Sequence, residues 1–229
     1  MTKTLLVCFA HPDDEIGTAG TMAAHAARGD RVVLTFLTRG EMTTAFPKLT
    51  QEQIKKERTK DGEDVAKMLG ADIHFFDFPD SGVEGTRASA VEVAKFVAEI
   101  KPDAVVTWGE AWTGGARHPD HQATGKIVRD ALSYARFGSV IAPFEPHRVR
   151  APVFTYRDRH SQIPPVYVDV AKHLDKILAV AKYYSERMGW PTHDWVLARL
   201  NAKGKPANLP YAEVFEAWET DPGVVTHLI

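Results

Sequence analysis

Two short β-rich runs flank a helical pattern within the first 38 residues, and this arrangement constrains the fold more than any other feature of the chain. The runs are residues 5–10 and 31–38, and the first is continuously apolar, as in a strand covered on both faces. Between them, the alanine-rich segment 17–28 ends at Gly29, which predicts a helix with a glycine stop. Strand, helix and strand in this order predict a βαβ unit with two parallel strands.

The same alternation continues along the chain. Further strands are expected at four β-rich runs, 73–78, 104–108, 153–156 and 166–170. Two capping boxes, Thr50 with Gln53 and Ser89 with Glu92, and later apolar spacing predict helices at 50–69, 89–101, 124–135, 171–188 and 211–218. This order predicts one open, mainly parallel, Rossmann-like α/β sheet with helices on both faces, in a single domain over residues 1–229.

Polar residues follow the first four expected strands, each at the point where the strand ends. The segment AHPDDE occupies residues 10–15, and RHPDH at 117–121 closes the polar stretch after the fourth strand. Residues 38–41 and 79–82 hold the corresponding positions after the second and third strands. In a sheet of this kind ligands bind outside the carboxyl ends of the strands, so these segments predict a site at one edge.

The crowded acidic residues of AHPDDE suggest a divalent cation, which would neutralise them. His11 and Asp14, together with one histidine of RHPDH, form a His-Asp-His set. Three protein ligands with one open position are typical of catalytic zinc, which lowers the pKa of bound water from ~15.7 to about 7. Simpler readings also exist, because acidic residues favour helix N-termini and Asp120 could serve only as a helix cap.

Composition narrows the remaining classes of function. The 229 residues can bury a core without a structural metal, and the net charge of -2 provides no basic field for nucleic acid or anionic membranes. Cys8 is the only cysteine, and neither a signal-peptide layout nor a membrane-spanning run is found, so we expect a cytoplasmic protein without a membrane span. A nucleotide-binding Rossmann protein is a competing class, but the sequence contains neither of the glycine-rich phosphate-binding motifs.

The motifs together resemble the LmbE-like, PIG-L-type family of zinc N-deacetylases. The matching stretches lie in family order over about 170 residues: AHPDDE, LTRGE at 37–41, Arg58-x-x-Asp61, FPDSG at 78–82, HPDHQAT at 118–124 and VYVDV at 166–170. The resemblance implies a Rossmann-like fold, a Zn²⁺ cofactor and hydrolysis of acetamides, often of N-acetylglucosamine derivatives. It also implies a homo-oligomer acting on a small-molecule N-acetylated sugar, with an amidase for a non-sugar amide as the alternative.

The resemblance further assigns roles to individual residues. It implies zinc binding by His11, Asp14 and His121, with Asp13 as general base and His118 as oxyanion stabiliser or proton donor to the leaving amine. Arg58 and Asp80 match family positions that hold sugar hydroxyls or a phosphate-like group, and Glu41 lies at the same rim. The chain departs from the family where Tyr183 and Glu186 replace a late histidine and glutamine. Four further residues are candidates for the pocket lining, namely Trp108, Trp112, Arg117 and Tyr156.

Overall fold

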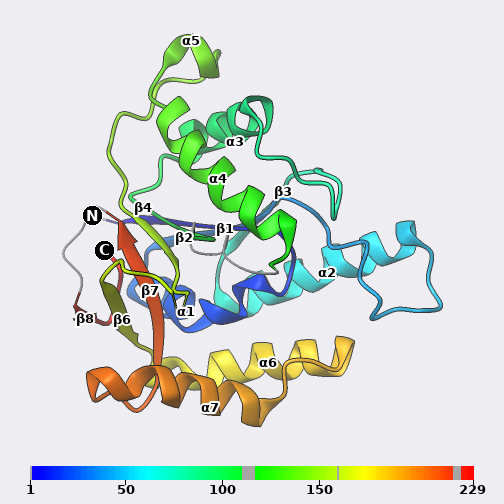
Figure 1. Cartoon of the computed structure of the whole chain (residues 1–229), viewed down its shortest axis with the longest axis vertical. Coiled ribbons are helices and arrows are strands. Elements are labelled where there is room, and N and C mark those ends of the chain that lie inside the picture. Colours follow the sequence, from blue (N-terminus) through cyan, green and yellow to red (C-terminus); the bar gives the residue numbers. More distant parts are fainter. Residues whose placement is uncertain (1, 110–116, 159, 219–222) are drawn as a thin grey trace.

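The computed structural model describes residues 2–109, 117–158, 160–218 and 223–229. Within these residues eight strands form one sheet in the order β3-β2-β1-β4-β5-β7-β6-β8 (Figure 1). The strands are β1 Thr4–Phe9, β2 Arg31–Phe36, β3 Asp72–Phe75, β4 Ala104–Thr107, β5 Val153–Tyr156, β6 Pro165–Asp169, β7 Ala212–Trp218 and β8 Val224–Val225. Adjacent strands are parallel except that β7 runs antiparallel to both β5 and β6. The predicted α/β fold with a mainly parallel sheet is therefore confirmed.

Helices cover both faces of this sheet. They are α1 Ala19–Arg28, α2 Gln51–Leu69, α3 Arg87–Ile100, α4 Pro119–Tyr134, α5 Gly138–Ile141, α6 Leu174–Met188 and α7 His193–Gly204. In the described part of the chain, the short 3₁₀ helices η1 Asp14–Gly17, η3 Ala171–His173 and η4 Lys205–Ala207 accompany them. Figure 1 shows α3, α4 and α5 on one side of the sheet and α1, α2, α6 and α7 on the other. None of the helices in these described ranges is long and apolar enough to span a bilayer.

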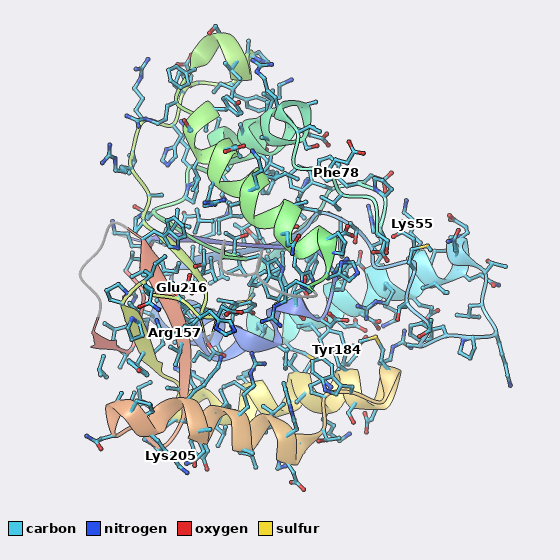
Figure 2. All side chains as sticks on the ribbon, in the orientation of Figure 1. Lys55, Phe78, Arg157, Tyr184, Lys205 and Glu216 are labelled. Carbon is cyan, nitrogen blue, oxygen red and sulfur yellow. The ribbon has the colours of Figure 1, made fainter. Side chains whose placement is uncertain are left out.

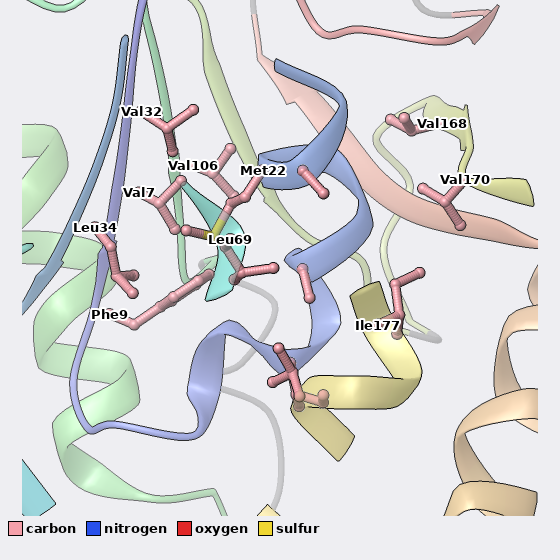
Figure 3. Close-up of a cluster of buried hydrophobic side chains, with 14 of the residues drawn as sticks. Val7, Phe9, Met22, Val32, Leu34, Leu69, Val106, Val168, Val170 and Ile177 are labelled. Atoms are coloured by element: carbon pink, nitrogen blue, oxygen red, sulfur yellow. The ribbon is translucent and has the colours of Figure 1, made fainter. Parts of the chain in front are cut away.

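The alternation of side chains along β1 divides the core into two layers. Val7 and Phe9 point to the layer that holds Met22 and Ile177 (Figure 3), whereas Leu6 and Cys8 point to the layer covered by α3 and α4. All four β1 side chains are fully buried. Because both faces of β1 are covered, its apolar run has no polar alternation, as the sequence analysis expected.

The predicted βαβ unit is present, and its local signals have the expected geometry. β1 and β2 pair in parallel, from Thr4 with Arg31 onward. Gly29 ends α1 in the left-handed region with φ 92°, a conformation that glycine adopts without steric cost. At the start of α2, the Thr50 side chain accepts from the Gln53 N–H and the Gln53 side chain accepts from the Thr50 N–H, which confirms the capping box.

Two element predictions are wrong, and two helices were not predicted. Residues 211–218 were expected to be helical, but Ala212–Trp218 form the interior strand β7, which is buried from Ala212 to Ala217. Ser89 was expected to cap α3, yet its N–H donates to the Thr86 hydroxyl, so Thr86 is the cap. Helices α5 and α7 lie in segments for which no element was predicted.

Candidate active site

Polar segments that follow β1, β2, β3 and β4 meet at one edge of the sheet, beside the point where the strand order reverses. They surround a cavity of about 460 Å³. The turn after β1 and the start of α4 bring five of the predicted residues to this cavity: His11, Asp13, Asp14, His118 and His121.

Three side chains direct atoms that could ligate a metal toward one another within the cavity. His121 Nε2 lies 3.2 Å from Asp14 Oδ1 and 3.3 Å from His11 Nδ1, and His11 Nδ1 lies 3.6 Å from Asp14 Oδ2. Zinc ligands at about 2.0–2.1 Å on a tetrahedron are separated by roughly 3.3–3.4 Å, so these atoms have the spacing of a zinc ligand set. The His-Asp-His set expected from the sequence therefore converges in space.

Asp14 is held so that one of its oxygens stays available. Its Oδ2 accepts from the backbone N–H groups of Ala10 (3.1 Å) and His11 (3.0 Å), and from Trp108 Nε1 (3.3 Å). Although burial raises the pKa of Asp14, the neighbouring His121 and His11 rings hold it far below its usual range. The Trp108 ring also stacks on His121, with ring centroids 4.0 Å apart, so the same indole orients two residues of the set.

The opposite nitrogen of His11 faces two further carboxylates. Nε2 donates to Asp120 Oδ2 and to Asp80 Oδ1, each at 3.1 Å. Burial alone lowers the pKa of His11, but Asp120, Asp14 and Asp80 raise it to about 12. The carboxylates thus stabilise positive charge on or beside this imidazole, and Nδ1 remains directed at the zinc-like set. A carboxylate on the remote nitrogen of a ligating histidine is the usual way to orient it.

Two overlapping groups of potential ligand atoms lie within 4.8 Å of one another in the described part of the chain: His11 with His118 and His121, and His11 with Asp80 and Asp120. In the second group the carboxylates face His11 Nε2, on the side of the ring away from His121. Both carboxylates also accept backbone N–H groups, Asp80 from Met42 and Asp120 from Ser81 and Val83. We therefore assign them the role of orienting His11.

Asp13 diverges from Asp14, as expected for a residue outside the candidate ligand set. Its backbone is left-handed, with φ 111°, and its Oδ2 accepts from Arg58 Nη2 at 2.7 Å. Burial raises the pKa of Asp13 to about 7, against the opposing effect of Arg58. A carboxylate with this pKa is suited to accept a proton near neutral pH.

His118 occupies the N-cap of α4. Its Nδ1 accepts from the Asp120 N–H at 3.3 Å, which assigns the proton of the neutral ring to Nε2. Burial lowers the pKa of His118, and its ring centroid lies 4.7 Å from that of His11 and 5.1 Å from that of His121. The position beside the zinc-like set is compatible with its predicted role as a donor.

The three predicted substrate-binding residues are tied to the protein itself. Arg58 is 1% exposed, and besides Asp13 it donates to Pro12 O and, at 3.2 Å, to Asp61 Oδ2. Asp80 is engaged with His11 and Met42, whereas Glu41 Oε1 accepts from the Asp80 N–H at 3.2 Å. Arg58 and Asp80 border the cavity, so substrate contact stays a prediction for them and for Glu41.

The four residues proposed from the sequence for the pocket lining have different locations. Trp108 and Tyr156 line the cavity, and the Tyr156 hydroxyl donates to Asp14 O at 2.6 Å. Arg117 instead pairs with Asp158 at 2.8 Å and is not part of the lining. Trp112 lies outside the described residues.

Tyr183 and Tyr184 lie outside the cavity lining and donate hydrogen bonds to acidic residues near the site. The Tyr183 hydroxyl donates to Asp61 Oδ1 (3.1 Å) and Asp64 Oδ2 (2.8 Å), and so joins α6 to α2. Tyr184, labelled in Figure 2, projects from α6 and donates to Glu15 Oε1 at 2.5 Å. The departure from the family pattern therefore falls at a packing position and not in the cavity lining.

Three functional candidates escaped the sequence analysis. Asp120 was considered only as a helix cap, although its place inside HPDH was a usable signal. Trp190 and Arg199 line the cavity from the α6–α7 connection and from α7, and no local motif marks them.

Comparison with known proteins identifies the family of the chain and agrees with its fold. The family model described as PIG-L, GlcNAc-PI de-N-acetylase, matches residues 6–132, which include both histidine motifs. The chain therefore belongs to the PIG-L family of de-N-acetylases, and the resemblance noted from its motifs is confirmed.

Particular relatives give the family match more detail. Diacetylchitobiose deacetylase of Thermococcus kodakarensis is 29% identical over 203 residues, covering 85% of this chain and 73% of the relative. The Bacillus anthracis protein named "Probable N-acetyl-alpha-D-glucosaminyl L-malate deacetylase 2" is 33% identical, covering 57% of this chain and 60% of its own length. The match thus spans less than two thirds of that second relative.

Solved structures share the fold along almost the whole chain. The N,N'-diacetylchitobiose deacetylase of Pyrococcus horikoshii superposes with a TM-score of 0.83 at 21% identity, covering 94% of this chain and 84% of that one. The 4-carboxy-2-hydroxymuconate hydratase of Pseudomonas putida has a TM-score of 0.77 at 20% identity and covers 100% of both chains. Likenesses this distant in sequence establish the fold and leave the reaction to be argued from the site.

Proposed function

We propose that this protein is a zinc-dependent N-deacetylase that hydrolyses the acetamide of an N-acetylglucosamine derivative. The observation that carries the proposal is the convergence of His11 Nδ1, His121 Nε2 and the Asp14 carboxylate beside the Asp13 carboxylate and the imidazole of His118. The names of the relatives, deacetylases of diacetylchitobiose and of a glucosaminyl malate, support the choice of substrate class.

The residues present fit a zinc ion. Two imidazole nitrogens and one carboxylate oxygen form a nitrogen- and oxygen-rich set that zinc accepts, and the carboxylates on His11 Nε2 complete its orientation. When bound, zinc supplies a Lewis acid that polarises a carbonyl and lowers the pKa of water to about 7. His11, Asp14 and His121 would hold it.

The protein's own groups account for the proton transfers of amide hydrolysis. Asp13 accepts a proton from the water that attacks the acetyl carbonyl, while Arg58 holds the carboxylate in place at 2.7 Å. His118, whose ring lies beside those of His11 and His121, carries its proton on Nε2 and stabilises the negative oxygen that develops on the carbonyl. The C–N bond then breaks, the amine takes the proton that Asp13 accepted from the water, and the products are acetate and a free amino sugar.

The cavity has the size and walls of a small-molecule site. At about 460 Å³ it falls within the range of roughly 300–1,000 Å³ that is common for such sites. Trp108 and Tyr156 provide aromatic surface beside the polar set, and such rings pack well against the apolar face of a sugar. The site combines an apolar wall with a few fixed polar groups.

Acetate release provides the test. Diacetylchitobiose, N-acetylglucosamine and N-acetylated amino acids are incubated with the protein, with zinc added or with a chelator. We expect acetate from the sugars only, and only with metal. Release from the amino acids alone would favour the non-sugar amidase, and metal-independent release would overturn the proposal.

His118→Ala sharpens this test because the variant separates catalysis from metal binding. Loss of one oxyanion donor typically costs about 10²- to 10³-fold in kcat, so we expect slow turnover with zinc content and KM near those of the parent. Zinc loss in this variant with zinc retained in His121→Ala would show that the two histidines exchange roles.

The expected homo-oligomer and the cytoplasmic location also remain proposals. They rest on the family resemblance and on the single cysteine of the sequence. Sedimentation of the purified protein and fractionation of cells that produce it would test the two separately.

A further inference from the structure

One wall of the cavity comes from the C-terminal helices and is not part of the zinc-like set. Helix α6 ends at Gly189, whose left-handed backbone (φ 80°) turns the chain toward α7. Trp190 in this connection and Arg199 on α7 both line the cavity. Figure 1 shows α6 and α7 packed as a layer on the α1 and α2 side of the sheet.

Arg199 differs from the other arginine of the cavity lining. Arg58 pairs with both Asp13 and Asp61, so its charge is neutralised within the protein. For Arg199, by contrast, no carboxylate within ion-pair distance is found in the described parts of the chain, and its side chain is only partly buried. An arginine with these properties at a cavity wall is suited to bind a carboxylate or phosphate of a ligand.

Trp195 contacts both Arg199 and Trp190, the two residues that line this wall. Its ring lies 5.1 Å from the Arg199 guanidinium carbon, one helical turn along α7, and its centroid lies 5.1 Å from that of Trp190. The two indoles are 46% and 41% exposed, which is unusual for side chains of this size outside a binding surface. Contact with one ring therefore restrains both the guanidinium and the second indole before any ligand arrives, which lowers the entropic cost of binding.

The charges around the cavity determine where an anion could bind. Asp13, Asp14 and Asp80 lie at the zinc-like end, where they repel an anionic group that is not itself a metal ligand. Arg199 and Trp190 lie on the wall formed by the C-terminal helices. We propose that this wall is a subsite for an anionic substituent, a carboxylate or phosphate, on the part of the amino sugar away from its acetamide. The proposal rests on the deacetylase function proposed above.

Two matched glycosides test the charge preference. The carboxymethyl glycoside of N-acetylglucosamine carries one carboxylate, and its carbamoylmethyl analogue has nearly the same shape without the charge. Their affinities for the zinc-loaded Asp13→Asn protein are measured by calorimetry, which needs no turnover. We expect the acid to bind roughly 10- to 100-fold more tightly, the range typical of a hydrogen bond to a charged group. N-acetylglucosamine 1-phosphate serves as the phosphate arm.

Substitutions at Arg199 connect the preference to this residue. In the same background, Arg199→Gln should reduce the acid-to-amide affinity ratio to near one, whereas Arg199→Lys should keep part of it because lysine retains the charge without the planar fork. Arg31→Gln removes an exposed arginine that pairs with Asp72 on the β2–β3 edge, and it should leave the ratio unchanged. The subsite is wrong if the acid-to-amide affinity ratio is unchanged in Arg199→Gln. It is also wrong if the parent binds neither the carboxymethyl glycoside nor the 1-phosphate more tightly than the carbamoylmethyl glycoside.

Acetate release by the parent distinguishes failure of this inference from failure of the proposed function. If acetate is released from both carboxymethyl and carbamoylmethyl glycosides with equal kcat/KM and equal affinity, the deacetylase stands and the anionic subsite is wrong. If neither compound releases acetate but the acid binds through Arg199, the subsite stands and the proposed reaction is wrong.

Discussion

Two groups of carboxylates lie close together in this molecule, and they differ in the partners that neutralise them. The histidine-facing cluster, Asp14, Asp80 and Asp120, surrounds the imidazoles of the cavity. The arginine-facing cluster, Asp61, Asp64 and Glu57 on α2, faces Arg58, Arg187 and Tyr183. Arginine is always charged, so it neutralises the second cluster at any ordinary pH, whereas an imidazole carries positive charge only when it has bound a proton or a metal ion.

The residue type that faces the carboxylates, histidine or arginine, therefore distinguishes a functional cluster from a structural one better than the number of acids does. Arg58 joins the two, because it donates to Asp13 on the cavity side and to Asp61 on the other. Substitutions in the histidine-facing cluster should change metal binding and rate with little effect on folding. Substitutions in the arginine-facing cluster should do the reverse.

The largest effect is expected for His121→Ala. Removing one of three ligands should abolish stoichiometric zinc binding and reduce turnover to background, while the large core keeps the fold. Elemental analysis and circular dichroism measure the two properties. His193→Ala, at an exposed position on α7, is the control and should keep its metal. Full zinc occupancy in His121→Ala would remove this residue from the ligand set.

Asp13→Asn should have the second-largest effect. The amide retains the shape but cannot accept the proton, so kcat should fall by about 10²- to 10⁴-fold while zinc remains bound. Steady-state kinetics beside metal analysis separate the two effects. A variant with near-parental kcat on any substrate would mean that Asp13 only anchors Arg58.

Asp61→Asn tests the arginine-facing cluster. Asp61 is fully buried and accepts from Arg58, Arg187 and Tyr183, so neutralising it should lower the free energy of unfolding by about 3–5 kcal/mol. Urea denaturation gives the loss, and zinc content should stay at the parental value. Tyr183→Phe, which removes one donor, should cost only about 1 kcal/mol. Zinc loss in Asp61→Asn without a change in stability would contradict the division between the clusters.

The smallest effect near neutral pH should come from a histidine–carboxylate pair outside both clusters, because its contribution to stability changes only at acid pH. His25 is buried, its Nδ1 lies 2.8 Å from Asp30 Oδ2, and its Nε2 accepts from the Leu228 N–H at 3.1 Å, so both nitrogens are used by the protein. Burial, with help from Arg28 and His227 and against Asp30, lowers the pKa of His25 to about 4.

The sign of the pH dependence follows from that shift. The folded pKa of His25 lies below the unfolded value of 6.5, so the unfolded chain binds the proton first as pH falls. His25 should therefore reduce stability progressively from about pH 6.5 down to about pH 4, by roughly 3 kcal/mol in total. Urea melts across this range measure it, and His25→Gln should flatten the profile. An unchanged slope in the variant would assign the dependence to other groups.

The candidate metal ligands and proton-transfer residues could be predicted from the sequence, because they belong to two local motifs. A βα turn places His11, Asp13 and Asp14 within one short stretch, and HPDH adds His118 and His121 in another. Since carboxyl ends of parallel strands meet at one edge, adjacency in space followed from the fold alone. The roles of Asp80 and Asp120 were harder to foresee, because each depends on which nitrogen of His11 it contacts.

The C-terminal half was predicted less well because its signals act over long distances. In β7, Glu213 and Glu216 are three residues apart, which resembles the polar side of a helix. Both are fully buried, and their partners lie on α1 and β5, where Thr155 donates to Glu216 at 2.9 Å. No local pattern reveals such partners, so the strand was mistaken for a helix and α7 was missed.

The contact between Glu213 and α1 has a consequence for how the protein is made. Glu213 accepts the N–H groups of Gly20 and Thr21, each at 2.8 Å, and is 193 residues away from the first of them along the chain. Synthesis at about 5–20 residues per second puts roughly 10–40 s between the emergence of the two ends of this contact. Throughout that interval the first turn of α1, directly after the AHPDDE segment, lacks its acceptor. The segment translated first is thus among the last to be completed, and a nascent chain cannot acquire the finished site before β7 leaves the ribosome.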